Sequence, residues 1–378
     1  MEVLIENLQV LLKNFDFITW QMVVMWAIGG VLIYLAVVKE MEPTLLLPMG
    51  FGAILVNLPV EVAGTGVQHV LDTLFSIGIE GAELFPLMLF IGIGAMIDFT
   101  PLLTNPKLMI FGAAAQFGIF FTRALASLLG YDIKDAASIA IIGAADGPTS
   151  IFVATELGSK YLGAIMVAAY SYMALVPLVQ PPIIKLCTTK AERKIKMQYK
   201  GKPVSKLTKI LFPIVVTVIV GLVAPDAVAL IGFLMFGNLI RECGVMNSIS
   251  ETAQNALANL ITIFLGITIA SQMKAADFLQ IDTLVIIGLG LVAFVFDTFG
   301  GIMVAKIMNI FAKEKINPMI GAAGISAFPM SARVVHKMGL EEDNQNFLLM
   351  HSIGVNVSGQ IASVIAGGLI LALVKAMI

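Results

Sequence analysis

One carboxylate stands in the middle of an apolar stretch, in the segment IGAADGPTS at residues 142–150. Asp146 is followed at once by Gly147 and Pro148, and then by the hydroxyls of Thr149 and Ser150. Because proline removes a backbone donor and glycine permits an unwound chain, the segment predicts a broken hairpin tip. Its carboxylate, hydroxyls and free carbonyls are hard oxygen ligands, which suit a small alkali cation. The alternative is that Asp146 only caps a helix at a shallower depth.

The elements around this segment are those of a membrane protein. Of the 378 residues, 58% are hydrophobic and 13% are charged, whereas a soluble domain carries about 25% charged residues. A carboxylate near the centre of a bilayer costs on the order of 3 kcal/mol, so Asp146 indicates a function. We expect an all-α polytopic membrane protein with apolar segments at about 17–38, 44–58, 84–104, 108–130, 136–157, 161–184, 208–223, 226–240, 257–275, 282–305, 316–337 and 347–376.

The two halves of the chain resemble each other. LFPLMLFIGIGAMIDFTPLL (84–103) is similar to LITIFLGITIASQMKAADFL (260–279), and the DGPT segment is similar to IGAAGISAFPMSARVVHKMG (320–339). These matches indicate an internal duplication, which is typical of transporters. If the segments around 142–150 and 320–339 each enter the membrane and return, every half makes five crossings and the halves are inverted. We therefore expect two inverted-topology repeats, each with about five transmembrane helices plus a broken or re-entrant hairpin.

This reasoning divides the chain into four parts. Residues 1–16 are expected to form an interfacial amphipathic segment, and residues 17–184 the first repeat with the DGPT hairpin. Residues 185–209 carry nine Lys or Arg, so the positive-inside rule predicts a cytoplasmic loop. Residues 210–378 form the second repeat, with the hairpin NPMIGAAGISAFPMSAR at 317–333.

The second hairpin has no acid and complements the first with neutral and basic groups. In an inverted pair the two tips meet near the midplane, and each hairpin is followed by a helix with polar groups. The candidate donors are Asn317, Ser326, Ser331 and Arg333 on the hairpin, and Tyr172, Asn356, Ser358 and Gln360 on the helices. Asn356 and Gln360 have the alternative of ordinary interhelical hydrogen bonds. Asp297 and Arg123 hold matching places in the two halves, where they either pair or lie near helix ends, and we favour a structural role for both.

At this point the motifs resemble a known family, the β subunit of the biotin-dependent sodium-translocating decarboxylases of oxaloacetate, methylmalonyl-CoA and glutaconyl-CoA. The resemblance covers essentially the whole chain. It is carried by GAADGPTSIFVATELG (143–158), AAYSYMALVPLVQPPI (168–183), NPMIGAAGISAFPMSARV (317–334) and FLLMHSIGVNVSGQIAS (347–363). It implies a multi-pass protein of the bacterial inner (cytoplasmic) membrane that decarboxylates carboxybiotin, exports sodium and consumes a proton.

The resemblance also implies roles for single residues. Together with the reasoning above, it predicts catalytic residues Asp146, Tyr172, Ser326 and Arg333, with Arg333 also contacting carboxybiotin. The predicted sodium ligands are Asp146, Thr149, Tyr172, Asn317 and Asn356, and the predicted structural hairpin residues are Gly147, Pro148 and Gly321.

Several partners are implied in the same way. The sequence contains neither Ala-Met-Lys-Met nor Val-Met-Lys-Met, the sequences at which biotin is attached, and IKMQY does not match them. Carboxybiotin is therefore expected on a separate biotin carrier protein. The other expected partners are a carboxyltransferase α subunit, one or more small membrane subunits and the lipid bilayer, in an oligomer, with no nucleic acid. The basic loop 185–209 is either a dock for the carrier or only a topology signal.

Two other classes of function fit parts of the pattern. A sodium-coupled dicarboxylate transporter of elevator type also uses inverted repeats with broken hairpins, and it would be active without biotin. A non-catalytic membrane anchor has no need of the buried oxygens around Asp146. The sequence contains no Walker motif, so ATP hydrolysis by this chain is not expected.

Overall fold

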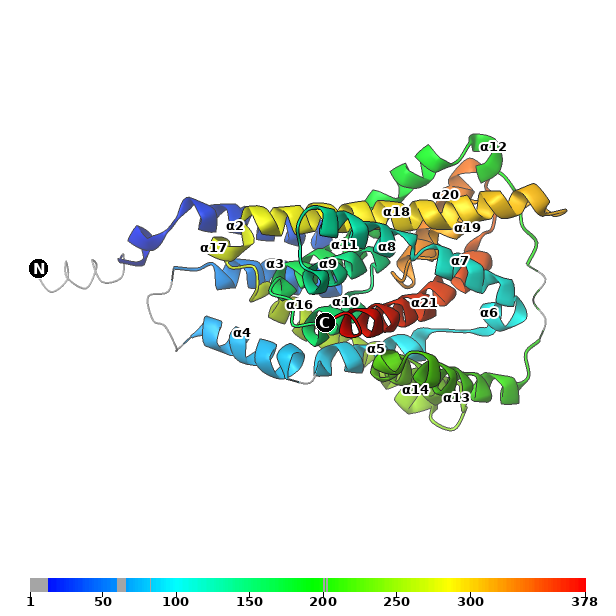
Figure 1. The fold of residues 1–378 in the computed structure, drawn as a ribbon, viewed down its shortest axis with the longest axis horizontal. Helices are drawn as coiled ribbons and strands as arrows, with labels where there is room; N and C mark the ends of the chain where they lie inside the picture. Colours follow the sequence, from blue (N-terminus) through cyan, green and yellow to red (C-terminus); the bar gives the residue numbers. More distant parts are fainter. Residues whose placement is uncertain (1–12, 60–65, 82, 200, 202) are drawn as a thin grey trace, which may run out of the picture. The chain divides into compact units, whose positions relative to one another are not determined.

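The computed structural model describes residues 13–59, 66–81, 83–199, 201 and 203–378 (Figure 1). Within these residues all regular secondary structure is helical, which confirms the predicted all-α class. Most of the predicted interfacial segment 1–16 lies outside the described residues. Its last part belongs to a short 3₁₀ helix, η1 (Lys13–Phe17), which ends shortly before the first long helix.

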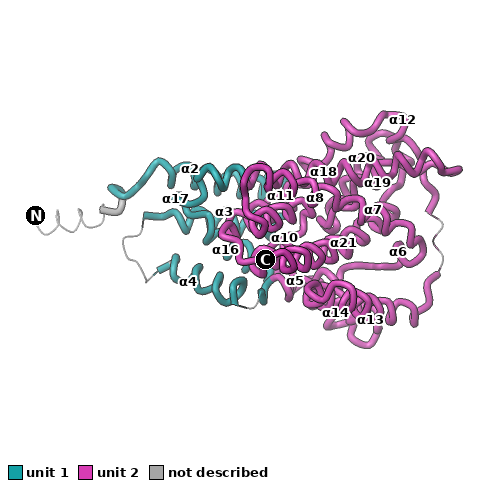
Figure 2. The backbone as a smooth tube through the Cα atoms, viewed as in Figure 1, with its two compact units in different colours: residues 1–85, 260–285 teal, residues 86–259, 286–378 magenta. Residues whose placement is uncertain are grey.

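The chain forms two compact units (Figure 2). Unit 1 comprises residues 1–85 and 260–285, and unit 2 comprises residues 86–259 and 286–378. Each unit therefore contains residues from both halves of the sequence, and the units do not coincide with the two predicted repeats.

Two glycines allow a close helix contact within unit 1. A Cβ atom added at Gly29 or at Gly50 would lie 2.7 Å from the other glycine's carbonyl oxygen. Helices α2 (Trp20–Val37) and α3 (Pro43–Val56) approach this closely because neither glycine carries a side chain.

The helices of unit 1 are α2 (Trp20–Val37), α3 (Pro43–Val56), α4 (Val67–Phe75), the π-helix η2 (Ser76–Glu80), most of α16 (Ala258–Ala270) and α17 (Ala275–Phe278). The first half of unit 2 contains α5 (Leu84–Met96), which begins in unit 1, α6 (Thr100–Thr104), η3 (Pro106–Leu108), α7 (Met109–Ala114), α8 (Phe117–Leu128), α9 (Ile133–Ala140), η4 (Ile141–Ala144), α10 (Gly147–Glu156), α11 (Leu162–Cys187) and α12 (Lys190–Arg193). The rest of unit 2 contains α13 (Lys206–Val223), η5 (Pro225–Ala227), α14 (Val228–Glu242), α15 (Asn247–Thr252), η6 (Ala253–Leu257), α18 (Ile281–Phe311, which begins in unit 1), α19 (Met319–Ala322), α20 (Met330–Glu342) and α21 (Leu349–Lys375).

Seven helices in the described part of the chain are long and apolar enough to cross a membrane, or eight if the pair Gln68–Glu80 and Leu84–Met96 counts as one span. The seven are Trp20–Val37, Pro106–Leu128, Leu162–Cys187, Lys206–Val223, Asn247–Ala270, Ile281–Phe311 and Leu349–Lys375. The chain is thus a multi-pass membrane protein. The other three predicted crossings, 44–58, 84–104 and 226–240, correspond to shorter helices in α3, α5 and α14.

Both predicted hairpins are broken where the sequence places the break. In the first, α9 and η4 lead to Ala145, whose φ of 51° turns the chain before α10 begins at Gly147. An alanine in this left-handed region is unusual, and it is maintained here by the surrounding structure. In the second, α19 and α20 are separated by residues 323–329. Helix α21 packs against both hairpins, through α10 in the first and through α19 and α20 in the second.

Candidate functional site

Asp146 is buried, with 2% of its surface exposed, and four donors converge on its carboxylate. Its Oδ2 accepts hydrogen bonds from Thr149 Oγ1 at 2.9 Å, Gln360 Nε2 at 3.0 Å and Ser363 Oγ at 2.7 Å. Its Oδ1 accepts only one bond, a long one of 3.4 Å from the backbone N–H of Thr149. Asp146 therefore is the N-cap of α10, as the simpler alternative required, and also joins this hairpin to α21. A helix cap alone does not explain the two donors from α21.

The polar groups of α21 lie on one face of the helix. Asn356, Gln360 and Ser363 follow one another at spacings of four and three residues, which brings them to the same side. Asn356 Nδ2 donates to the carbonyl of Ile325 at 2.7 Å, while its Oδ1 has no partner among the described residues. The face thus carries donors toward Asp146 and one free oxygen a turn away. Ser363 is not among the predicted site residues, although its spacing of three residues from Gln360 places it on the same face of the helix.

The two hairpin tips meet at Ser326. Its backbone N–H donates to the carbonyl of Ala144 at 2.9 Å, and its hydroxyl donates to the carbonyl of Gly359 on α21 at 3.0 Å. A Cβ atom at Gly359 would lie 2.0 Å from the carbonyl oxygen of Gly324, so only glycine lets α21 approach the second tip this closely. Ser326 therefore connects both tips with the polar helix.

The predicted structural residues have clear geometric reasons. A Cβ atom at Gly321 would lie 2.1 Å from the carbonyl oxygen of Gly301, where the second hairpin crosses α18. A Cβ atom at Gly147 would lie 2.4 Å from the ring of Tyr170. Pro148 occupies the first turn of α10, where a missing backbone N–H costs nothing.

Tyr172, predicted as a sodium ligand and catalytic residue, has another partner. Its hydroxyl donates to the carbonyl of Ile287 in α18, and its ring stacks on Phe294 with a centroid distance of 6.5 Å. The structure therefore places its hydroxyl between α11 and α18, bonded to backbone and not to Asp146.

Asn317, another predicted ligand, belongs to a separate cluster near the basic loop. Its Nδ2 donates to the carbonyls of Arg193 at 2.8 Å and Ile195 at 2.9 Å, and its Oδ1 accepts from the N–H of Met319 at 3.1 Å. Asn346, at the far end of the second hairpin, donates to the same Arg193 carbonyl at 2.8 Å. Both the NH2 group and the oxygen of the Asn317 amide are thus bonded to backbone atoms, and none of these atoms belongs to a partner of Asp146.

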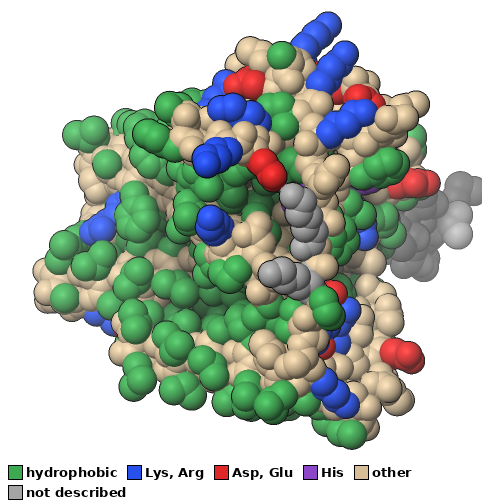
Figure 3. All heavy atoms as spheres, turned by 90° about the vertical axis from the view of Figure 1, so that its right-hand side faces the viewer, with side chains coloured by type: hydrophobic (Ala, Val, Ile, Leu, Met, Phe, Trp, Pro, Cys, Tyr) green, Lys and Arg blue, Asp and Glu red, His purple; other side chains and the backbone are tan. Residues whose placement is uncertain are grey.

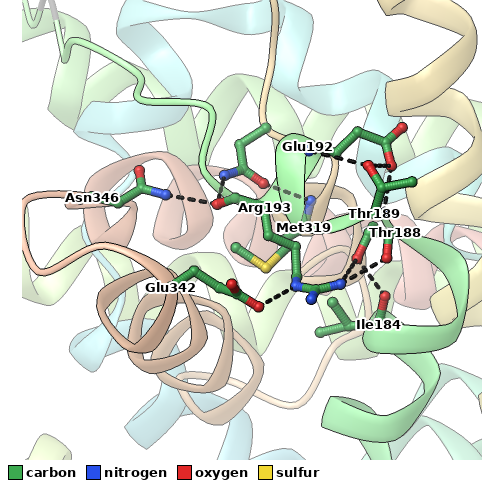
Figure 4. Close-up of polar contacts among 9 residues, drawn as sticks. Ile184, Thr188, Thr189, Glu192, Arg193, Met319, Glu342 and Asn346 are labelled. Carbon is green, nitrogen blue, oxygen red and sulfur yellow. Dashed lines mark hydrogen bonds and ion pairs between the residues drawn. The ribbon is translucent and has the colours of Figure 1, made fainter.

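Arg193 completes this cluster, which we call the clamp and which consists of Arg193, Asn317, Glu342 and Asn346. Figure 4 shows Arg193 between Glu342 and Asn346. Its guanidinium donates to the carboxylate of Glu342 and to the carbonyl of Thr188, the latter at 2.7 Å (Figure 4). The hydrogen bond from Arg193 holds the pKa of the Glu342 carboxyl below its usual range. The basic loop is therefore folded onto both ends of the second hairpin.

Arg333 is exposed on α20 and is not part of the Asp146 cluster. The basic loop carries exposed lysines at positions 185, 190, 194 and 196. Lys190 and Lys194 interact electrostatically with Glu342 of the clamp, and Lys196 forms an ion pair with the adjacent Asp343. Figure 3 shows Lys and Arg side chains gathered over this end of unit 2, close to α12. An anion arriving at this face meets several positive charges.

Asp297 and Arg123, which hold matching places in the two halves, do not pair. Asp297 is fully buried in the middle of α18 and accepts a hydrogen bond from the N–H of Gly118, in the first turn of α8. Arg123 contacts Met377 Sδ at 3.8 Å instead. The side-chain oxygen of Asp297 thus caps α8 from a distant part of the sequence, because the first N–H groups of a helix have no partner within the helix.

The oxygen set around Asp146 suits a monovalent cation. It combines one carboxylate with the hydroxyl oxygens of Thr149 and Ser363, while Gln360 contributes the N–H of its amide. The described residues contain no group of three or more His, Cys, Asp or Glu that would hold a metal ion. Neutral oxygens beside a single charge are ligands for an alkali cation.

Comparison with known proteins agrees with these motifs. A model of the family described as the Na⁺-transporting oxaloacetate decarboxylase beta subunit matches residues 21–374. The methylmalonyl-CoA decarboxylase subunit beta of Propionigenium modestum is 48% identical, over 93% of this chain and 94% of that protein. The glutaconyl-CoA decarboxylase subunit beta of Acidaminococcus fermentans is 49% identical, over 96% of each chain. The oxaloacetate decarboxylase beta chain of Haemophilus ducreyi is 45% identical, over 96% of this chain and 97% of that protein.

Proposed function

The chain belongs to the β-subunit family of sodium-transporting decarboxylases, and we propose that it decarboxylates carboxybiotin on a partner carrier protein and exports sodium in the same cycle. The bilayer is then the bacterial inner membrane, with the basic loop in the cytoplasm and the two repeats inverted. A carboxyltransferase α subunit, a biotin carrier protein and small membrane subunits complete the complex. The alternative, a sodium-coupled dicarboxylate transporter, shares the hairpins but works without biotin.

The cluster around Asp146 supports this proposal most directly. A single buried carboxylate is held by three neutral side-chain donors. Its Oδ1 accepts a long bond of 3.4 Å from the Thr149 N–H, and the Oδ1 of Asn356 has no partner among the described residues, so both oxygens have lone pairs for a ligand. Because Asp146 accepts either sodium or a proton but hardly both, its occupancy couples sodium release to proton uptake. Decarboxylation breaks the bond between the biotin nitrogen and the carboxylate, releases CO2 and leaves the electron pair on that nitrogen. The nitrogen then takes up the proton that Asp146 exchanges, which restores biotin.

The remaining predicted residues receive distinct roles in this scheme. Arg333, exposed and cationic, attracts the carboxylate of carboxybiotin at the cytoplasmic face. Ser326 keeps the two tips in register beside the ion. Asn317 acts through the clamp by fixing the start of the second hairpin.

The decisive experiment measures CO2 release from free carboxybiotin by the purified chain in detergent, with and without sodium. We expect sodium-stimulated release that Asp146→Asn abolishes while the chain still assembles, because the change is nearly isosteric. The matched control is Asp135→Asn, since Asp135 is also a buried acid of the first hairpin but bonds Ser159 and not α21. Absence of release, together with sodium-dependent dicarboxylate uptake in liposomes, would make the chain a symporter.

A further inference from the structure

Tyr170 is a fully buried tyrosine whose hydroxyl has no hydrogen-bond partner in the part of the chain that the structure describes. It lies on α11, two residues before Tyr172. Buried polar groups are nearly always paired, because removing them from water without a partner is costly. An unpaired phenol in the membrane interior therefore requires a reason.

The position of the ring supplies one. A Cβ atom added at Gly147 would lie 2.4 Å from both Cε2 and Cζ of Tyr170. Cζ carries the hydroxyl, and Gly147 directly follows Asp146, so the phenol lies against the tip that holds the carboxylate. The ring packs on the backbone at Gly147, while Gln360 and Ser363 of α21 bond the carboxylate of the preceding residue.

Tyr172 differs in the respect that matters for a ligand. Residues two apart on a helix point roughly 200° from each other, and Tyr172 accordingly faces α18, where its hydroxyl is already bonded to the Ile287 carbonyl. Of these two tyrosines, only Tyr170 combines contact with the DGPT tip and a hydroxyl that has no partner among the described residues.

We propose that the neutral hydroxyl of Tyr170 is an oxygen ligand of the sodium ion that binds at Asp146. This inference rests on the proposed function and adds a ligand to its ion site. A phenol oxygen offers lone pairs to a cation, as a backbone carbonyl oxygen does, and the phenol keeps its proton when it does so. The close contact with Gly147 then has a second consequence, because any side chain at that position would push the phenol away from the ion.

The competing explanation is packing, in which the ring fills space over Gly147 and the hydroxyl is incidental. Tyr170→Phe separates the two, since it keeps the ring and removes only the oxygen. Tyr172→Phe is the matched control, because it removes a hydroxyl from the same helix that is bonded elsewhere.

The experiment follows thermal unfolding of the detergent-purified complex that contains this chain, across a sodium titration in which potassium keeps the ionic strength constant. Without sodium, Tyr170→Phe should unfold at the wild-type temperature or above it, because an unpaired buried hydroxyl is gone. Its half-saturating sodium concentration should rise about tenfold, the loss expected for one interaction with a charge. Tyr172→Phe should keep the wild-type value.

The outcomes separate the two proposals. A wild-type half-saturating sodium concentration in Tyr170→Phe would overturn the inference and leave the ion site at Asp146 intact. Absence of any sodium-specific stabilisation in the wild type would overturn the proposed ion site, and the inference with it. Asp146→Asn, which should show no sodium response, verifies that the titration reports on this site.

Discussion

Asn317 provides the sharpest test of how the sequence-based assignments should be revised. The resemblance makes it a sodium ligand, whereas the structure engages its amide with the backbone of the clamp. We predict that Asn317→Ala lowers the stability of the protein and leaves the sodium requirement unchanged. The matched variant is Asn346→Ala, which removes a second donor to the same carbonyl of Arg193.

The expected magnitudes follow from the bonds that each change removes. Asn317 makes three hydrogen bonds, at 2.8, 2.9 and 3.1 Å, and each is worth about 1 kcal/mol net, so the loss is about 3 kcal/mol. Asn346 makes one such bond, so its loss is about 1 kcal/mol. Because the Arg193 carbonyl accepts from both amides, the double variant should lose more than the sum of the single variants.

Two measurements on the purified complex check this prediction. Thermal unfolding should rank Asn317→Ala below Asn346→Ala and both below the wild type. The sodium dependence of decarboxylation should give half-saturation values within about twofold of the wild type, because no bond near Asp146 is removed. Normal unfolding combined with a strongly raised sodium requirement would refute the reasoning and restore Asn317 as a ligand.

Three further predictions concern packing, pH and the second buried acid. Gly321→Ala should destabilise the protein by about 1–3 kcal/mol, because its Cβ would lie 2.1 Å from the Gly301 carbonyl, whereas Gly288→Ala, which meets nothing within 4 Å, should unfold like the wild type. Since the pKa of Glu342 is lowered in the folded protein, its ion pair contributes stability above the carboxyl's unfolded pKa and is lost as the pH falls through the lowered value; acid unfolding of Glu342→Gln should therefore depend less on pH, and an unchanged pH dependence would contradict this. Asp297→Asn should keep the unfolding temperature, because the amide oxygen still caps α8, while Asp297→Ala should lose about 1–3 kcal/mol; equal losses in both variants would show that the charge itself is required.

Features that depend on local backbone chemistry are predictable from the sequence. The break at Asp146 follows from the adjacent glycine and proline, and the structure shows an N-cap and a new helix at that place. Apolar length likewise identifies the long membrane helices. These predictions succeed because each depends on a few consecutive residues.

The choice between two tyrosines is not predictable in the same way. Tyr170 and Tyr172 are both largely buried on a helix that is packed on several sides. With neighbours on both faces, hydrophobic periodicity does not reveal which face meets the DGPT tip. The contact with Gly147 and the state of the hydroxyl, unpaired in Tyr170 and bonded to Ile287 in Tyr172, distinguish them in the structure.

Long-range polar contacts are not predictable from the sequence for a related reason. Asn317 bonds a carbonyl 124 positions earlier in the chain, and Asp297 bonds an N–H 179 positions earlier. A polar residue in an apolar segment shows that a partner exists, but backbone partners leave no mark in side-chain sequence. The resemblance therefore identifies which residues matter more readily than what each one contacts.

The second hairpin is held at its tip and at its base by different partners. At the tip, Ser326 bonds Ala144 of the first hairpin and Gly359 of α21, while at the base Asn317 bonds the backbone of the basic loop. A displacement of the loop would therefore act on the base, and the hairpin would transmit it to the residues beside Asp146. A carrier protein that binds the exposed lysines near α12 would thus reach the ion site through one structural element. We therefore expect Asn317 to affect turnover through the position of the second hairpin, without contacting sodium.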